Sequence, residues 1–297
     1  MIHTPVMIDE VLHYLALQQG DTVIDATAGY GGHTFAIARA IGSKGNILAI
    51  ERDDVMASFL CKRVIQQRLY QNVVVVNGNY RDLDDMCQDE QFENVSGVLF
   101  DLGFSSWHVE HSGRGFSFLR DEPLDMRYNA TDTSAQTAAD IINSAPRDTL
   151  EYIFQEYGEE PKAQHIAKAI FQKRRQEKIR TTQQLVDIIT SVVPRHTKRK
   201  THPATRVFQA LRIAVNDEIG ALKQGLYAAQ SHIGKDGRIV VISFHSLEDR
   251  VVKTVFQDWK KKGIGNILTK KVVVPHFTEV QRNRRSRSAK LRAFHSI

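Results

Sequence analysis

The stretch Val23-Ile-Asp-Ala-Thr-Ala-Gly-Tyr-Gly-Gly-His-Thr34 decides the fold, because an apolar run here passes into a glycine-rich turn. A helix-like segment, Phe35-Ala-Ile-Ala-Arg-Ala40, comes next. A second apolar run, Asn46-Ile-Leu-Ala-Ile50, then ends in Glu51, twenty positions after Gly31. Strand, glycine turn, helix, strand and acid in this order are typical of the nucleotide-binding half of a doubly wound sheet, in which the acid accepts hydrogen bonds from ribose hydroxyls.

The composition of the turn favours one ligand class over another. A dinucleotide site is expected to carry a third glycine where the helix starts, and this chain has Thr34 there. Small residues in the turn, with Asp25 before it, suit a zwitterionic ligand with a cationic sulfur better than a pyrophosphate. The pattern therefore predicts S-adenosylmethionine as the cofactor, and a methyltransferase rather than a dehydrogenase.

Strands and helices alternate over the first hundred residues. Strands are predicted at 22–26, 47–51, 72–77 and 97–101, and helices at about 6–17, 35–40 and 55–67, with an acidic helix before the fourth strand. This alternation predicts a parallel sheet whose ligand lies at the carboxyl ends of the strands.

From about residue 112 the alternation gives way to short helices. They are expected at 135–143, capped by Thr133 or Ser134, at 147–156, at 162–178, and at 183–193, capped by Thr182. A long helix at 207–232, a strand at 238–244, a helix at 248–261 and strands at 267–274 and 288–294 complete the chain. We therefore predict an α/β fold, a doubly wound, seven-stranded, Rossmann-like sheet of the S-adenosylmethionine-dependent methyltransferase type. Residues 1–111 and 203–297 form the methyltransferase domain, and residues 112–202 form an inserted all-helical domain expected to recognise RNA.

Positive charge is concentrated in two stretches of the chain. Residues 162–206 carry twelve Lys and Arg against two acids, and the last seventeen residues add six more cations and no acid, in a chain of formal net charge +6. The rest of the chain is therefore acidic, and the two basic stretches favour a polyanionic partner such as nucleic acid. The alternative to a nucleic-acid partner is that these stretches are a solvated helix face and a loose tail without a binding role.

No signal peptide or membrane-spanning run is visible, and the two cysteines, Cys61 and Cys87, show no metal-like spacing. We expect a cytoplasmic protein with reduced thiols, no metal site and no membrane partner. The sequence does not indicate an oligomeric state.

Four strand ends are expected to converge on one crevice. Gly29, Gly31 and Gly32 let the backbone approach the ligand, and the Gly31-Gly32-His33 amides can bind its carboxylate. Glu51 is expected at the ribose, and Tyr80 over the adenine. Asp101 lies where the two substrates should meet. With Ser105 and Ser106 it can accept hydrogens from a target amine and expose the nitrogen lone pair, so the predicted catalytic residues are Asp101, Ser105 and Ser106.

Several longer motifs carry a close family resemblance. They are Arg114-Gly-Phe-Ser-Phe118, Pro123-Leu-Asp-Met-Arg127, Tyr157-Gly-Glu-Glu160, His202-Pro-Ala-Thr-Arg-Val-Phe-Gln-Ala-Leu-Arg212, Val215-Asn-Asp-Glu218 and Ser243-Phe-His-Ser-Leu-Glu-Asp-Arg250. Together they resemble the MraW/RsmH family of bacterial small-subunit ribosomal RNA (cytosine-N4)-methyltransferases, from His3 to Arg292. The resemblance implies a seven-stranded fold with a helical insertion, and methylation of a decoding-centre cytidine.

The resemblance also implies cofactor contacts at Gly31, Gly32, His33, Glu51, Tyr80, Asp101 and His108. Three of these depart from the usual residue. Glu51 replaces a more common Asp, and Tyr80 stands where Phe is frequent. Ser105-Ser-Trp-His108 occupies a place usually written Ser-Ser-Pro-Gln, so this loop has Trp107 in place of a proline.

The RNA contacts are expected in the basic stretches and on the loop entering the insertion. We predict RNA-binding roles for Arg114, Arg127, Lys173, Arg174, Arg175, Arg195, Lys198, Arg199, Lys200 and Arg206. The C-terminal cations are expected to help hold the RNA. The partner is expected to be small-subunit ribosomal RNA within the small ribosomal subunit, although naked RNA is not excluded.

Three other groups of residues have two interpretations each. His245 and Asp249 can orient the base, or Ser246 can cap the next helix with Asp249 favouring its positive end. Arg114, Asp125 and Arg127 fit a lid better than catalysis, and Phe104 and Trp107 can stack a flipped cytosine or belong to the core. At the level of function, a DNA or other RNA amino-methyltransferase and a non-catalytic, cofactor-binding ribosome assembly factor are the alternatives. The chain lacks the prolyl pair typical of the DNA enzymes.

Overall fold

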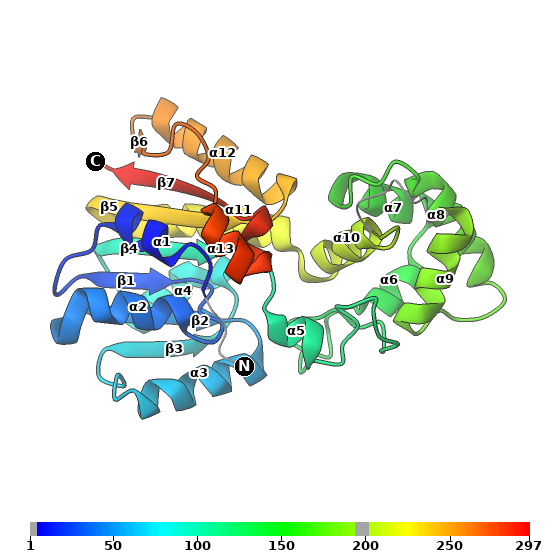
Figure 1. Cartoon of the computed structure of the whole chain (residues 1–297), viewed down its shortest axis with the longest axis horizontal. Coiled ribbons are helices and arrows are strands. Elements are labelled where there is room, and N and C mark those ends of the chain that lie inside the picture. The colour runs from blue at the N-terminus through cyan, green and yellow to red at the C-terminus, as the bar shows by residue number, and fades with distance from the viewer. Residues whose placement is uncertain (1–4, 194–201) are drawn as a thin grey trace. The chain divides into compact units, whose positions relative to one another are not determined.

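The architecture was obtained as a computed structural model that describes residues 5–193 and 202–297. One sheet of seven strands has the order β3-β2-β1-β4-β5-β7-β6 (Figure 1). The strands are β1 (Thr22–Asp25), β2 (Asn46–Glu51), β3 (Val73–Asn77), β4 (Val95–Asp101), β5 (Ile233–Ser243), β6 (Gly265–Ile267) and β7 (Lys290–Ser296). The first five are parallel, and β7 runs antiparallel to both β5 and β6. The predicted doubly wound sheet is confirmed. Its order reverses between β1 and β4, where such folds bind ligands.

Helices cover both faces of this sheet. They are α1 (Ile8–Leu15), α2 (Gly32–Ile41), α3 (Asp54–Gln66), α4 (Leu83–Asp89), α11 (Glu218–His232), α12 (Ser246–Lys261) and α13 (Phe277–Arg282). Short turns of 3₁₀-helix lie at η1 (Gly42–Lys44), η2 (Tyr80–Asp82) and η4 (Arg284–Ser288). Val23 packs into one hydrophobic core with α1, α2 and α3, and its neighbour Ile24 packs into a second with α4, α11 and α12. Successive side chains of a strand point to opposite faces, so both faces are buried and the strands read as continuous apolar runs.

A second compact unit is helical. It contains α5 (Ser106–Glu110), α6 (Ala138–Ser144), α7 (Arg147–Tyr152), a π-helical turn η3 (Ile153–Tyr157), α8 (Ala163–Lys173), α9 (Thr182–Val192) and α10 (Thr205–Asn216). Its own core includes Leu150, Phe154, Ile166, Leu185 and Leu211. Among its described residues the only β-pairing is an isolated bridge between Pro123 and Thr181.

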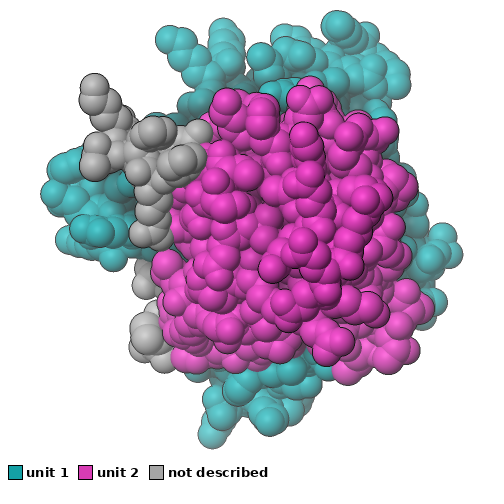
Figure 2. All heavy atoms as spheres, turned by 90° about the vertical axis from the view of Figure 1, so that its right-hand side faces the viewer, with its two compact units in different colours: residues 1–103, 219–297 teal, residues 104–218 magenta. Residues whose placement is uncertain are grey.

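The units divide the chain at 1–103 with 219–297 and at 104–218 (Figure 2), whereas the sequence suggested 1–111 with 203–297 and 112–202. The helical unit is larger because Val207, Phe208 and Leu211 of α10 belong to its core. On its other side, His108 contacts the rings of Phe116 and Tyr128, at centroid distances of 5.1 and 5.0 Å.

The predicted long helix at 207–232 was wrong. It is two helices, because Asp217 adopts a left-handed conformation (φ 45°) between α10 and α11. The side chain of Asn216 donates to the carbonyl of Met126 and accepts from the backbone N–H of Tyr128. Long-range bonds at the break therefore hold a geometry that helical periodicity does not reveal.

Two predicted helix caps were also wrong by one to four positions. Thr137, not Thr133 or Ser134, caps α6, in a capping box with Asp140. Thr181, not Thr182, caps α9, in a box with Gln184. Ser134 instead donates to Asp132 in a preceding turn. Near the C-terminus β6 is shorter than expected, and α13 was not predicted.

None of the helices in the described part of the chain has both the length and the apolar character that a membrane crossing requires.

Candidate functional site

The glycine turn after β1 brings the start of α2 to the switch point of the sheet. Gly31, the residue before α2, has φ 81°, and a Cβ there would lie 2.7 Å from side-chain atoms of both Leu60 and Phe35. Only glycine fits this position without strain. The first backbone N–H groups of α2, from Gly32 and His33 onward, have no partner within the helix, and such groups favour an anionic ligand.

Thr34 takes the place of a third glycine for a structural reason. Its hydroxyl donates to Asp25 Oδ2 at 2.7 Å, and both side chains are fully buried. The backbone N–H of Thr27 donates to the other oxygen at 3.3 Å. Burial raises the pKa of Asp25, and the Thr34 hydrogen bond opposes that shift. This tie between β1 and α2 was not predicted from the sequence, in which Asp25 stood out only as the end of an apolar run.

Glu51 ends β2 with both carboxylate oxygens aimed at backbone amides. Oε2 accepts from Gly29 N–H and Oε1 from Asp53 N–H, each at 2.8 Å. A carboxylate has about four acceptor positions, so each oxygen retains capacity for a further donor such as a ribose hydroxyl. Burial raises the pKa of Glu51 to about 7. The same residue thus shapes the glycine turn and offers acceptors to a ligand.

Tyr80 lies in η2, just after β3. Its ring meets Phe100 edge-on, with centroids 5.5 Å apart, and packs against Gly225 of α11. The ring is half-buried. Its placement at a strand end fits the predicted role over an adenine, which remains a prediction.

His33, in the first turn of α2, and Asp101, at the end of β4, form a close pair. His33 Nε2 lies 3.5 Å from Asp101 Oδ2, and the two side chains are 6% and 17% exposed. The backbone N–H of Asp101 donates to Thr27 Oγ1 at 2.6 Å, which fixes the end of β4 beside β1. Burial by itself lowers the pKa of His33, but the carboxylates of Asp101, Asp25 and Glu279 outweigh it, and the net shift is upward.

Three buried atoms of this pair have no hydrogen-bond partner among the described residues: both ring nitrogens of His33 and Oδ1 of Asp101. Leaving buried polar atoms unsatisfied costs about 1–3 kcal/mol each, so such atoms call for an explanation. A bound ligand that carries both donors and acceptors would satisfy them. The open atoms of His33 and Asp101 therefore fit an amino-acid-like, zwitterionic group, and the ribose contact of Glu51 remains a prediction.

The other predicted site residues lie in the helical unit. Ser105 is the N-cap of α5, and its backbone N–H donates to His108 Nδ1 at 3.1 Å. Ser106 is the first residue of α5 and is half-buried. The ring of His108 is 4% exposed and packs against Phe116 and Tyr128. The cofactor contact of His108 and the catalytic roles of both serines remain predictions, alongside these structural roles.

Phe104 and Trp107 each lie against an arginine. Phe104 is 41% exposed, stacks on Phe116, and has the Arg212 guanidinium 4.5 Å from its ring centre. Arg212 in turn makes a buried, two-point ion pair with Glu218, at 2.8 Å for both contacts. Phe104 is therefore not a core residue. Its ring is exposed and is held in place by Phe116 and Arg212, so a stacking contact with a base remains a prediction.

Several predicted RNA-binding arginines have internal partners. Arg127 makes a two-point pair with Asp125 at 2.8 Å, which raises the pKa of Arg127. Arg114 donates to the backbone carbonyls of Arg127 and Tyr128. Arg174 donates to the carbonyls of Ile142 and Ala145, and burial lowers its pKa.

Other predicted RNA-binding residues face solvent. Lys173 and Arg175 are exposed, and Arg175 lies over the ring of Phe171. Arg206 is exposed and donates to the carbonyl of Glu159. Arg195, Lys198, Arg199 and Lys200 lie outside the described residues.

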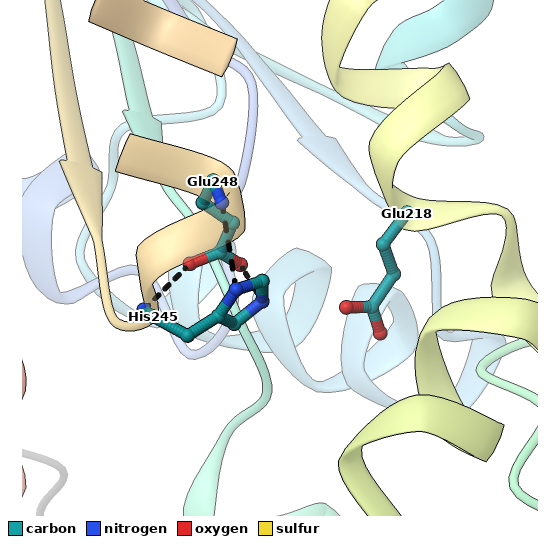
Figure 3. Close-up of side chains that lie close together, drawn as sticks. All are labelled: Glu218, His245 and Glu248. Atoms are coloured by element: carbon teal, nitrogen blue, oxygen red, sulfur yellow. Dashed lines mark hydrogen bonds and ion pairs between the residues drawn. The ribbon is translucent and has the colours of Figure 1, made fainter. Parts of the chain in front are cut away.

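At the start of α12 the side chains named in the sequence have structural partners, and a role in orienting the base remains a prediction. His245, not Ser246, is the N-cap, in a capping box with Glu248, and the two side chains also approach to 3.1 Å (Figure 3). Asp249 pairs with Arg292 of β7 at 2.7 Å. Glu218, also drawn in Figure 3, belongs to the helical unit and makes the ion pair with Arg212 described above.

Comparison with known proteins gives one consistent result. The MraW methylase family matches residues 1–297. The Ribosomal RNA small subunit methyltransferase H of Dictyoglomus thermophilum is 45% identical over 292 residues, which cover 98% of this chain and 95% of that protein. The protein of the same name from Elusimicrobium minutum is 40% identical over 296 residues, covering 99% and 98%.

Among solved structures, a Clostridium thermocellum protein provisionally described as an rRNA-methylase matches with a TM-score of 0.50. The match covers all of both chains, but the sequence identity is 13%, so it supports the fold and no statement about function.

Proposed function

The chain belongs to the MraW methylase family, and we propose that it transfers a methyl group from S-adenosylmethionine to the exocyclic N4 of a decoding-centre cytidine in small-subunit ribosomal RNA. The cofactor and the reaction class follow from the family. The target atom and the residues that act on it are the finer part of the proposal.

One observation carries the assignment of the site. Among the residues that the structure describes, His33 Nδ1 and Asp101 Oδ1 are buried atoms without a hydrogen-bond partner; His33 lies in the first turn of α2 and Asp101 at the end of β4, both in the same unit as Glu51. A structural ion pair would be expected to satisfy its own hydrogen bonds. A pair that leaves them open, at the switch point of the sheet, fits a cofactor and an amine that complete it.

S-adenosylmethionine supplies an electrophilic methyl group on a sulfonium, which becomes a neutral thioether when the methyl leaves. In the proposed arrangement the first amides of α2, at Gly32 and His33, bind the carboxylate of the cofactor. Glu51 accepts from its ribose hydroxyls, and Tyr80 covers its adenine. These contacts position the sulfonium, and proximity provides much of the rate enhancement.

Asp101 is proposed to act on the target amine. The lone pair of a cytosine amine is delocalised into the ring, and a carboxylate that accepts an N–H favours the pyramidal nitrogen that can attack. Asp101 Oδ1, which has no hydrogen-bond partner among the described residues, is the acceptor for this contact. Ser105, the N-cap of α5, and Ser106, its first residue, follow Asp101 closely in the chain. When the N–C bond forms, the nitrogen loses one proton, to Asp101 or to water. The ring of His33 lies next to Asp101 and is the electrostatic partner of the carboxylate; burial lowers the pKa of His33, but the neighbouring carboxylates outweigh it and the net shift is upward.

The RNA is proposed to contact the exposed cations of the helical unit, including Lys173, Arg175 and Arg206. Arg114, Arg127 and Arg174 are proposed mainly to hold the backbone in place, because they already have protein partners. We further propose that the substrate is the small ribosomal subunit, in the cytoplasm.

A methyl-transfer assay tests this function. Labelled S-adenosylmethionine is offered to small ribosomal subunits lacking the modification, to free ribosomal RNA and to duplex DNA, and the product is digested to nucleosides. N4-methylated cytidine from subunits or RNA is the expected result. Label in DNA would indicate a DNA amino-methyltransferase, and no transfer to any substrate despite cofactor binding would indicate an assembly factor.

A further inference from the structure

The structure separates the C-terminal cations into two groups. Arg292 donates to both oxygens of Asp249, at 2.7 and 3.2 Å, and Lys290 lies 3.8 Å from the same carboxylate. These two cations hold β7 against α12. The remaining four are exposed and lie on α13 and η4: Arg282, Arg284, Arg285 and Arg287.

The segment that carries these arginines is ordered by its own hydrogen bonds. Asn283 Oδ1 accepts from the backbone N–H of Arg285 at 3.3 Å, and Ser286 Oγ donates to the carbonyl of Asn283 at 2.8 Å. Ser286 is fully buried, and its carbonyl accepts from Ala289 N–H at 2.8 Å. Because the turn buries its serine, the arginines on either side face solvent in a set arrangement. A loose basic tail would not have these internal hydrogen bonds or a buried serine.

Exposed apolar side chains precede these charges in the chain. Phe277, the first residue of α13, is 70% exposed, and Val274 is 59% exposed. An open hollow of about 570 Å³ is bordered by Val280, Gln281, Arg284 and Arg287. An exposed aromatic ring beside arginines is the combination that single-stranded nucleic acid binds, with bases on rings and phosphates on cations.

This surface adjoins the proposed cofactor site. Glu279 of α13 accepts from the backbone N–H of Met7 at 2.9 Å, and its charge acts on His33. Pro5, two residues before Met7, lies against Gly32, where an added Cβ would come within 3.1 Å of it. The N-terminal segment thus links α13 to the glycine turn, within one compact unit (Figure 1).

We propose that the α13–η4 face, formed by Val274, Phe277, Arg282, Arg284, Arg285 and Arg287, binds the single-stranded RNA segment that flanks the methylated base. Phe277 stacks on a base, and the arginines contact phosphates on either side of it. The inference rests on the proposed function and adds a second RNA contact to it, on the methyltransferase unit rather than on the helical insertion. Its position next to the glycine turn places that contact near the reacting base.

The charge contribution is tested with two matched pairs of substitutions. Arg284→Ala with Arg287→Ala removes two proposed phosphate contacts, and Lys260→Ala with Lys261→Ala removes two exposed charges from the end of α12. Single strands lose about 0.7 in the salt slope per contact, so the arginine pair should lower the slope of RNA binding by roughly 1.4. It should also raise KM for the subunit, with kcat and the affinity for S-adenosylmethionine unchanged. The lysine pair should match the parent chain.

The stacking contribution is tested at Phe277. Phe277→Ala should weaken RNA binding by roughly five- to hundredfold, the range found for lost base stacking, whereas Phe277→Tyr keeps the ring and should retain affinity. All of these positions are exposed, so the melting temperature serves as the control for folding. A photoreactive phenylalanine analogue at position 277 should form a cross-link to RNA when the full chain is mixed with small subunits.

The outcomes distinguish this inference from the proposed function. If the parent chain methylates subunits but the arginine and lysine pairs behave alike, the inference fails and the function stands. A cross-link only to ribosomal protein would overturn the RNA assignment and give the face a protein partner. If the parent chain methylates no RNA, the proposed function fails, and the inference with it.

Discussion

The affinity for S-adenosylmethionine should depend on pH through Glu51. Burial raises the pKa of this carboxyl from 4.5 to about 7, and the amides of Asp53 and Gly29 only partly offset the shift. Ribose hydroxyls donate best to the ionised form, so cofactor binding should favour the carboxylate and lower its pKa. The affinity should therefore rise as the pH increases through 7 and fall below it.

The expected size of this effect follows from the fraction of Glu51 that is ionised. With a pKa of about 7 that fraction is roughly one-tenth at pH 6 and nine-tenths at pH 8. If only the carboxylate makes the full set of contacts, Kd should fall by roughly tenfold between these pH values, equivalent to about 1.4 kcal/mol. The effect of Glu51 on folding stability has the opposite sign. Without the cofactor, the free energy of unfolding should fall as the pH rises from 4.5 to 7, because the carboxyl ionises more readily in the unfolded chain than in its buried site.

Isothermal titration calorimetry at pH 6, 7 and 8, in buffers of different ionisation enthalpy, measures both the affinity and the protons released. Glu51→Gln removes the titration at nearly constant volume, and Glu51→Asp keeps an acid that is shorter by one methylene. The glutamine variant should bind more weakly at pH 8, with a flatter pH profile. Asp25, Asp53, Asp101 and His33 also lie in or near the site, and the slope left in the glutamine variant reports on them. Equal slopes in the parent chain and in Glu51→Gln would refute the reasoning.

Four further outcomes are expected. Asp101→Asn should slow single-turnover methylation at saturating cofactor more than it weakens cofactor binding; a normal rate would leave Asp101 with a positioning role only. Gly31→Ala should lower the free energy of unfolding, measured by chemical denaturation, by about 1–3 kcal/mol and should weaken cofactor binding. The reason is that φ at this position is positive and the added Cβ would clash with the side chains of Leu60 and Phe35. Unchanged stability and affinity would remove the argument for this turn. Arg212→Ala should cost about 3–5 kcal/mol of stability by leaving Glu218 buried without its partner, and a loss below about 1 kcal/mol in the same assay would show that water replaces the pair. Arg195, Lys198, Arg199 and Lys200 form a basic cluster in the insertion. Neutralising these four residues should lower the salt slope of RNA binding by at most about 0.9 per lost contact and leave the affinity for the cofactor unchanged. Identical RNA binding across a salt series would show that the cluster is only a solvated surface.

The sequence alone determined the layered fold and the strand ends at which the cofactor site is proposed. Apolar runs that end at Asp25, Glu51 and Asp101 predicted three strand ends, and a parallel sheet brings such ends to one edge. The glycine turn predicted a helix after it, expected at 35–40 and found from Gly32, because glycine adopts the positive φ of Gly31 without strain. These inferences succeeded because strand ends and turns are encoded by residues close together in the chain.

Only the tertiary structure decided which charged side chains are exposed to a binding partner, and which polar atoms have no hydrogen-bond partner among the described residues. Arg114, Arg174 and Arg292 look like RNA contacts in the sequence, yet each is bound to a backbone carbonyl or a carboxylate far away in the chain. The approach of His33 to Asp101 is likewise a contact across 68 positions that no local pattern reports. Helical and strand periodicities arise from neighbouring residues, whereas desolvation and pairing of charged groups depend on what packing places beside them. For this reason the strand ends could be predicted from the sequence, but the pairing and burial of the charged groups near them could not.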